Sequence, residues 1–318
     1  MIRILFAGSP DIAVPTLETL AGEGGGDWEL AGLLTNADRR KSRSSRAEPT
    51  AAGAAADRLS IAQLKPEKLD GAARKAAAAL KPDLLVSFAY GKIFGPKFLA
   101  LFPLGGINIH PSLLPKYRGP SPIPAAILHR ETETGITIQR LAPEMDTGNI
   151  LLQERFPLDG RETTASLSDT VARKSAVLIT KVIRDLGSGE IEERPQNHGE
   201  ATYCSLLSKE DGRISWSLSA VEIDARIRAF TPWPLAWTTH GGEMLFILQG
   251  RPLDCAPPED VPSSGPGTVL GIQANQGILV QTGDGVLVLE RLQYQTRKAL
   301  DWKAFINGAR NFLQAQLV

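Results

Sequence analysis

Residues 2–10 read IRILFAGSP, an almost unbroken apolar run that ends in a small polar turn. Such a run is typical of a parallel strand covered on both faces, and Gly-Ser-Pro is typical of the turn into a helix. Similar β-rich runs recur at residues 29–35, 84–88 and 106–109. We expect these four runs to lie in one sheet.

Helical patterns separate the β-rich runs, at residues 16–21, 51–59 and 71–80, and a longer amphipathic pattern ends at Gly187. Strands that alternate with helices require crossover connections and therefore a parallel sheet. The sequence predicts a doubly wound, Rossmann-like α/β domain over residues 1–189, with a parallel sheet.

The composition changes at residues 190–208, which are rich in Gly, Glu, Pro, Gln and Asn and which we interpret as a linker. A β-rich region follows over residues 209–318. Its runs at 278–281 and 286–289 flank the sequence TGDG, a hairpin signal. Several short antiparallel strands in about 110 residues favour a small barrel, which we expect to be OB-like.

The composition is not that of a disordered, collagen-like or low-complexity protein. The 318 residues are 42% hydrophobic and 22% charged, which is ordinary for two globular domains. The 35 basic and 35 acidic side chains cancel, so a nucleic acid would have to be held by a local patch. The two cysteines, Cys204 and Cys255, have no metal-site or disulfide spacing. With no signal peptide or membrane span, we expect a cytoplasmic protein without a metal.

The turn Gly8-Ser9-Pro10 follows the first expected strand, where open α/β sheets bind anions or substrates. It matches neither a dinucleotide fingerprint nor a P-loop. A binding role and a purely structural turn are both compatible with it, and we expect the structural turn.

Asn108 and His110 end another expected strand, just before Pro111. Residues two apart in a strand point to the same face, so both side chains should converge at the carboxyl edge of the sheet. An amide donor and a protonated imidazole suit a carbonyl oxygen that becomes an oxyanion. Taken singly, such a His is as often a hydrogen-bonded group in a turn.

Asp146 lies in a Gly-containing loop between β-rich runs at residues 135–141 and 150–156. If this loop returns to the same sheet edge, Asp146 would favour a charged imidazole and accept a proton during reaction. An Asp before Thr-Gly is also a common turn residue. The three polar groups together favour a site over three separate structural roles.

Several motifs, in order along nearly the whole chain, resemble the formyltetrahydrofolate-dependent formyltransferases. Asn-x-His with a downstream Asp occurs across that family, whereas the Ser-Lys-Glu-Asp-Gly segment with a barrel behind it favours members that act on tRNA. The matching segments are FAGSPD (6–11), AYG (89–91), NIHPSLLPKYRG (108–119), MDTG (145–148), LSKEDGRISW (207–216) and IRAFTPWP (227–234).

The resemblance implies that Asn108, His110 and Asp146 are catalytic. The implied reaction moves a formyl group from 10-formyltetrahydrofolate, a co-substrate, to the α-amine of methionine on initiator tRNA, without a metal. Asn108 and His110 would hold the tetrahedral oxyanion, and Asp146 would orient His110 and help remove the amine proton. The folate-binding segment carried over from the family comprises Ser112, Leu113, Leu114 and Pro115.

A basic loop supplies the tRNA contacts that the resemblance implies. Phosphate contacts from Arg and Lys hold nucleic acid regardless of sequence, and a solvated surface loop is the alternative interpretation. With one further lysine at the start of the second domain, the expected tRNA-binding residues are Arg39, Arg40, Lys41, Arg43 and Lys209.

Two other functions remain open from the residues alone. A formyltransferase acting on an amino sugar would need a sugar-nucleotide pocket in place of a basic loop. A folate- or RNA-binding protein without catalysis would transfer nothing. We expect a monomeric tRNA-acting enzyme, and formylation of charged tRNA distinguishes the three.

Overall fold

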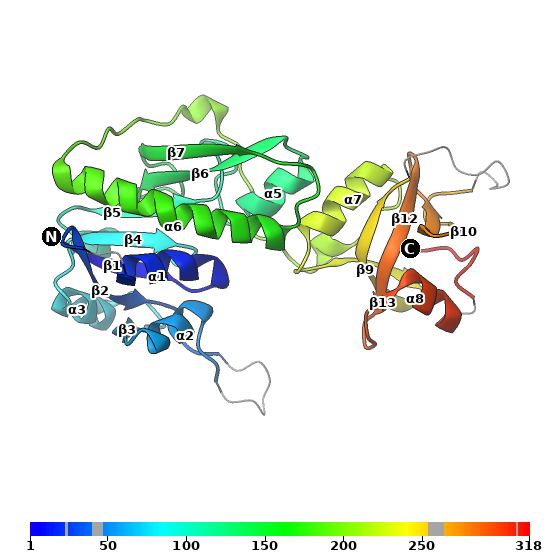
Figure 1. Cartoon of the computed structure of the whole chain (residues 1–318), viewed down its shortest axis with the longest axis horizontal. Helices are drawn as coiled ribbons and strands as arrows, with labels where there is room; N and C mark the ends of the chain where they lie inside the picture. Colours follow the sequence, from blue (N-terminus) through cyan, green and yellow to red (C-terminus); the bar gives the residue numbers. More distant parts are fainter. Residues whose placement is uncertain (23–24, 40–46, 254–263, 310) are drawn as a thin grey trace. The chain divides into compact units, whose positions relative to one another are not determined.

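The computed structural model describes residues 1–22, 25–39, 47–253, 264–309 and 311–318 (Figure 1). The chain forms two compact units. The first unit comprises Met1–Pro122, Glu133–Pro157 and Leu167–Ser205, and the second comprises Ile123–Thr132, Leu158–Ser166 and Leu206–Val318.

A seven-stranded sheet in the order β3-β2-β1-β4-β5-β6-β7 forms the centre of the first unit. The expected doubly wound sheet is confirmed for its first five strands, which are parallel. The strands are β1 (Ile2–Gly8), β2 (Trp28–Leu34), β3 (Gln63–Leu64), β4 (Leu84–Phe88), β5 (Gly106–His110), β6 (Glu133–Arg140) and β7 (Ile150–Pro157).

The expectation of an all-parallel sheet is wrong for the last two strands. β6 pairs antiparallel with β5 and with β7, so the sheet is mixed. A parallel connection needs a dozen or more residues, usually with a helix, and residues 141–149 between β6 and β7 are too short for one. That short reversal carries Asp146.

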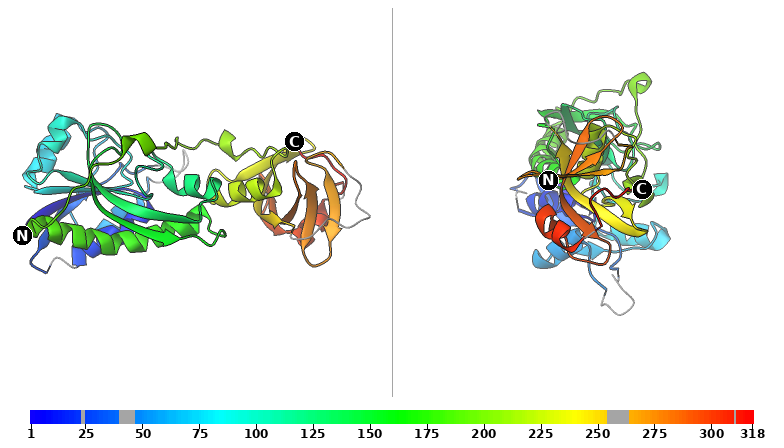
Figure 2. Two further views of the ribbon diagram at one scale, coloured as in Figure 1. Left: turned by 90° about the horizontal axis from the view of Figure 1, so that it is seen from above. Right: turned by 90° about the vertical axis from the view of Figure 1, so that its right-hand side faces the viewer.

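Helices cover both faces of the large sheet (Figure 2, left), and α6 runs along its strands (Figure 1). α3 and α4 pack on one face, where Ala77 and Phe98 join Leu5 and Leu85 in one buried cluster. Each of α2 and α3 begins at a side-chain cap, Thr50 or Asp70, as helix starts require. The helices are α1 (Val14–Gly22), α2 (Ala51–Arg58), α3 (Gly71–Ala79), α4 (Pro96–Leu99) and α6 (Thr164–Ser188).

The second unit contains a six-stranded antiparallel sheet in the order β10-β11-β12-β9-β8, with β13 beside β12. The predicted hairpin is confirmed, because β11 and β12 pair antiparallel across residues 282–285. Its elements are α5 (Pro122–Leu128), α7 (Ala220–Ala229), β8 (Ala236–His240), β9 (Glu243–Pro252), β10 (Val269–Gln273), β11 (Gly277–Gln281), β12 (Val286–Tyr294), β13 (Leu300–Asp301) and α8 (Trp302–Gly308).

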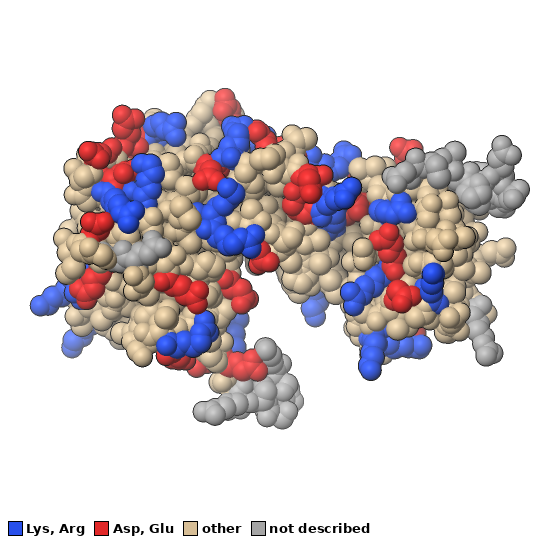
Figure 3. All heavy atoms as spheres, in the orientation of Figure 1, with Lys and Arg blue, Asp and Glu red and all other residues tan. Residues whose placement is uncertain are grey.

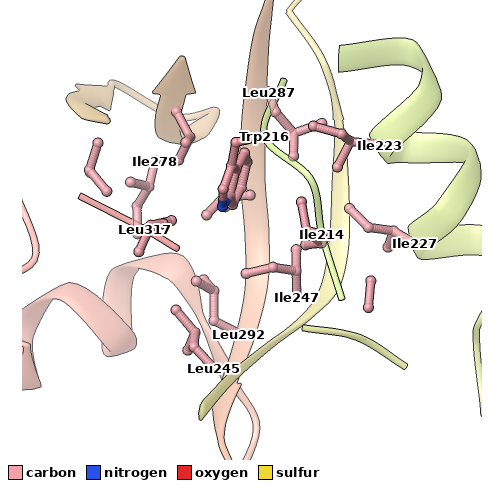
Figure 4. Packing of buried hydrophobic residues seen from close by; sticks show 14 of the residues in the cluster. Ile214, Trp216, Ile223, Ile227, Leu245, Ile247, Ile278, Leu287, Leu292 and Leu317 are labelled. Carbon is pink, nitrogen blue, oxygen red and sulfur yellow. The ribbon is translucent and has the colours of Figure 1, made fainter. Parts of the chain in front are cut away.

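A large apolar cluster forms the core of this unit, and Figure 4 shows Trp216, Ile247 and Leu292 within it. The polar end of Trp216 is satisfied, since its Nε1 donates to Thr238 Oγ1 at 3.0 Å. Residues 314–318 then join the two edge strands. Val318 exchanges backbone hydrogen bonds with Thr239 next to the end of β8, and Gln314 donates to Val269 at the start of β10.

Candidate active site

Strand β5 presents Asn108 and His110 on one face, as predicted. Asn108 is half-buried and His110 is buried. Across the antiparallel pair, Asn108 lies opposite Gln139 and His110 lies opposite Thr137. Directly opposed residues share a face, so four polar side chains line this part of the sheet.

Asp146 returns to this edge of the sheet. Its Oδ1 lies 3.6 Å from Nδ1 of His110. The carboxylate is held by two donors: Gln139 Nε2 donates to Oδ1 at 2.9 Å, and the Gly119 amide donates to Oδ2 at 2.8 Å. Asp146 adopts a left-handed backbone conformation, with φ 56°. The structure thus brings His110 and Asp146 together.

The surroundings of His110 act on its protonation in opposite directions. Burial lowers the pKa of its imidazole, and the Asp146 carboxylate and the Tyr117 carbonyl oppose that effect without cancelling it. His110 Nε2 lies 2.8 Å from the Tyr117 carbonyl oxygen, which can only accept, so Nε2 carries the proton. The lowered pKa favours the neutral form of the imidazole, whose Nδ1 faces the Asp146 carboxylate.

The segment Ser112–Pro115 forms a tightly held loop after β5. Thr137 Oγ1 donates to the Ser112 carbonyl at 2.7 Å and accepts from the Leu114 amide at 3.1 Å. Gln153 Nε2 donates to the Leu114 carbonyl at 2.8 Å. Ser112 and Leu114 are buried, whereas Leu113 and Pro115 are half-buried. With these backbone groups already paired, side chains are the surface that this loop offers to a ligand.

The Gly8-Ser9-Pro10 turn has a structural role. Ser9 is buried, and its Oγ accepts from the Asn36 amide at 3.1 Å and from Asn36 Nδ2 at 3.0 Å. The hydroxyl also lies 3.2 Å from Thr35 Oγ1. The turn therefore ties β1 to the end of β2.

Of the five expected tRNA-binding residues, Arg39 and Lys209 lie within the described part of the chain. Arg39 is exposed and exchanges backbone hydrogen bonds with Glu48. Burial, and after it the charge of Arg39, lowers the pKa of Lys92. Lys209 is exposed, and its carbonyl accepts from Trp237 Nε1 at 3.0 Å. The other three, Arg40, Lys41 and Arg43, lie outside the described residues.

Sequence reasoning missed the glutamines and the arginine that surround Asp146. Gln139 lies in β6, whose sequence ETGITIQR mixes polar and apolar residues, so no local signal singled it out. Arg118 lies within the motif that supplied the expected site, yet it is 2% exposed. No local pattern indicated Gln196, whose contacts with residues far along the chain are described below.

Lys and Arg side chains are interspersed with Asp and Glu on the face that Figure 3 shows, in agreement with the balanced composition. Within the described ranges, no cluster of three His, Cys, Asp or Glu side chains is arranged to hold a metal ion. The same ranges contain no helix that is both long and apolar enough to span a membrane.

Comparison with known families identifies the class to which this fold and site belong. Residues 2–183 match the family described as formyl transferase, and residues 206–310 match the formyl transferase C-terminal domain. The chain belongs to the formyl transferase family.

Individual relatives are more specific. The chain is 46% identical to the methionyl-tRNA formyltransferase of Treponema denticola, over 98% of each chain. It is 42% identical to the methionyl-tRNA formyltransferase of Chloroflexus aggregans, over 96% of this chain and 97% of that protein.

Solved structures share the fold. HypX from Aquifex aeolicus, crystallised with tetrahydrofolic acid, superposes with a TM-score of 0.65 at 17% identity, covering 98% of this chain and 48% of HypX. The sugar 3N-formyl transferase WlaRD gives a TM-score of 0.64 at 20% identity, covering 94% of this chain and 99% of that one.

Proposed function

We propose that this enzyme transfers the formyl group of 10-formyltetrahydrofolate to the α-amine of methionine on initiator tRNA. The observation that carries the proposal is the agreement in length and sequence with methionyl-tRNA formyltransferases, at 38–46% identity over at least 96% of this chain. The paired Asp146 and His110 beside Asn108 supply groups suited to that chemistry.

Asn108 is the proposed donor to the formyl oxygen. Its amide lies on the same face of β5 as His110. As the α-amine attacks the formyl carbon, that oxygen becomes negative, and an oriented N–H stabilises the charge. The gain is largest where water is excluded, and Asn108 is half-buried beside buried neighbours.

His110 and Asp146 move the proton. The neutral imidazole accepts the proton of the attacking amine at Nδ1, and the Asp146 carboxylate stabilises the resulting imidazolium. The same N–H then protonates the departing nitrogen of the folate as its bond to the formyl carbon breaks. The amine loses one proton, the leaving nitrogen gains one, and His110 returns to its neutral form.

The loop of Ser112, Leu113, Leu114 and Pro115 is the proposed wall of the folate site. Apolar side chains on a rigid loop suit the flat ring of a pterin. Strand β4 pairs with β5, so the end of β4 is the adjacent strand end that could contribute to the same site. Holding two substrates in one orientation then supplies much of the rate.

The tRNA contacts are proposed for Arg39, Arg40, Lys41, Arg43 and Lys209. Residues 1–189 would carry catalysis, residues 190–208 would link the domains, and residues 209–318 would form an OB-like barrel that contacts tRNA. The hydrogen bonds of residues 314–318 to both edge strands support a closed barrel. We place the enzyme in the cytoplasm, with its tRNA substrate, and infer that it acts as a monomer.

The test is transfer of labelled formyl from 10-formyltetrahydrofolate by the purified protein. Initiator tRNA charged with methionine should become formylated, and the product is identified by mass spectrometry of the released amino acid. Uncharged tRNA and a nucleotide-linked amino sugar serve as alternative acceptors. Transfer to the sugar alone, or to no acceptor, would overturn the proposed function.

A further inference from the structure

Gln196 lies in the segment that the sequence analysis interpreted as a linker, yet it is only 6% exposed. Its Nε2 donates to the backbone carbonyls of Asp146 at 2.9 Å and Gly148 at 2.8 Å. The same nitrogen lies 3.2 Å from Oε1 of Gln139, whose own amide holds the Asp146 carboxylate. Gln196 therefore contacts the loop that carries Asp146 on both sides of Thr147.

The orientation of the Gln196 amide is fixed by Arg118. The guanidinium donates to Gln196 Oε1 from Nε at 3.1 Å and from Nη2 at 2.7 Å. Arginine has no acceptor, so the oxygen end of the amide must face it. The two N–H groups then face the carbonyl oxygens of Asp146 and Gly148.

Arg118 is itself immobilised. It is 2% exposed, donates from Nη2 to His198 Nδ1 at 3.1 Å, and approaches the hydroxyl of Tyr203 at 3.3 Å. Its two chain neighbours contact the candidate catalytic pair, because the Tyr117 carbonyl pairs with His110 and the Gly119 amide donates to Asp146. The tripeptide Tyr117-Arg118-Gly119 thus contacts His110, Gln196 and Asp146 in turn.

We propose that Gln196 is a positioning residue for Asp146. Its two donors hold the backbone that sets Asp146 in the left-handed conformation, and so direct the carboxylate toward His110. The inference rests on the proposed function, because the pair that it positions is the proposed proton carrier.

The geometry predicts an effect on catalysis rather than on binding. Asp146 Oδ1 and His110 Nδ1 are 3.6 Å apart, beyond an ordinary hydrogen bond, so a small backbone shift changes how strongly the carboxylate acts on the ring. Gln196 is buried behind the Asp146 loop, and no substrate contact is assigned to it. Substrate affinity should then depend little on it.

Gln196→Glu tests the donors. The glutamate keeps the length of the side chain and an oxygen for Arg118, but it places a second oxygen against the carbonyls of Asp146 and Gly148. We expect kcat to fall at least about tenfold, since a misplacement of about 1 Å costs on the order of 100-fold, with both KM values within about twofold. Asn197→Asp is the matched control: it makes the same change of charge at the next residue, which is exposed.

Gln196→Asn tests the reach without adding a charge. Its shorter amide cannot span from Arg118 to the loop, so the effect of Asp146 on His110 should weaken and the pKa of the His110 imidazole should fall. Titration of that imidazole by NMR measures the shift without any turnover. Cys204, the other titratable group that the Asp146 carboxylate influences, is the same residue in the variant.

The outcomes are separable. An inactive wild-type enzyme would overturn the proposed function, and the NMR titration would still test the positioning. An unchanged kcat in Gln196→Glu or an unchanged pKa of His110 in Gln196→Asn would overturn the inference. So would a fall in kcat accompanied by a comparable rise in KM and a loss of thermal stability.

Discussion

Asp146 Oδ1 faces His110 Nδ1 at 3.6 Å, although the two residues enter the site from different elements, a reversal between two antiparallel strands and the end of a buried strand. Two donors, Gln139 Nε2 and the Gly119 amide, leave the carboxylate little freedom. The arrangement couples a carboxylate to a buried imidazole without a direct hydrogen bond between them.

Asp146→Asn should lower kcat by about 100-fold or more, because loss of a group that assists proton transfer typically costs that much. Steady-state formyl transfer measures it. The fold should persist, since an amide still occupies the position. Glu144→Gln, an exposed change in the same loop, is the control and should keep normal turnover. Near-normal turnover of Asp146→Asn would remove Asp146 from the mechanism.

The pH dependence of kcat should report the His110 imidazole. The proposed base must be neutral, so the rate falls as the pH falls through its pKa, which burial places below 6.5. The Asp146 carboxylate raises that pKa, so in Asp146→Asn the acid limb of the residual activity should move to lower pH. A limb that stays in place or moves upward contradicts this assignment.

Gly148→Ala should displace the loop of Asp146. A Cβ at this position would overlap the Arg140 carbonyl oxygen, so the backbone must shift. We expect a loss of about 1–3 kcal/mol in the free energy of unfolding, together with a lower kcat. Denaturant unfolding and turnover measure the two. Gly22→Ala, where a Cβ meets no neighbour within 4 Å, should change neither appreciably.

Replacing the basic-loop residues Arg39, Arg40, Lys41 and Arg43 by glutamine should raise KM for tRNA and leave KM for the folate unchanged. Each lost phosphate contact should also reduce the slope of log KM against log salt by about 0.9. Kinetics at several salt concentrations measure both. Replacing Lys75 and Lys81 by glutamine provides a control. Lys75 lies in α3, and Lys81 precedes β4, at the edge of the sheet opposite to the carboxyl ends of the parallel strands. Unchanged tRNA kinetics would favour the solvated-loop interpretation.

Local patterns predicted the parts of the fold that depend on neighbouring residues. The run at 84–88 coincides with β4, and the alternation in β5 placed Asn108 and His110 on one face. The direction of β6 and β7 depends on how the chain reverses in space, which the run at 135–141 does not encode. The lowered pKa of His110 depends on burial, which folding creates and the local sequence does not show.

Gln139 and Gln196 could not be identified for a similar reason. Glutamine has no fixed preference for a site, and each residue gains its role from partners brought by folding, 57 positions apart in the case of this pair. Asp146 was identified because a Gly-containing loop between two expected strands is a local signal.

Backbone hydrogen bonds hold residues 190–205 against the rest of the first unit, which bears on how that unit is to be produced alone. The Thr202 amide donates to the Pro115 carbonyl, the Thr202 carbonyl accepts from the Arg118 amide, and Arg194 exchanges backbone hydrogen bonds with Ile150. A truncated protein ending at residue 183, the limit of the first family match, would discard Gln196 and uncover Arg118. A fragment intended for isotope labelling should extend through Ser205.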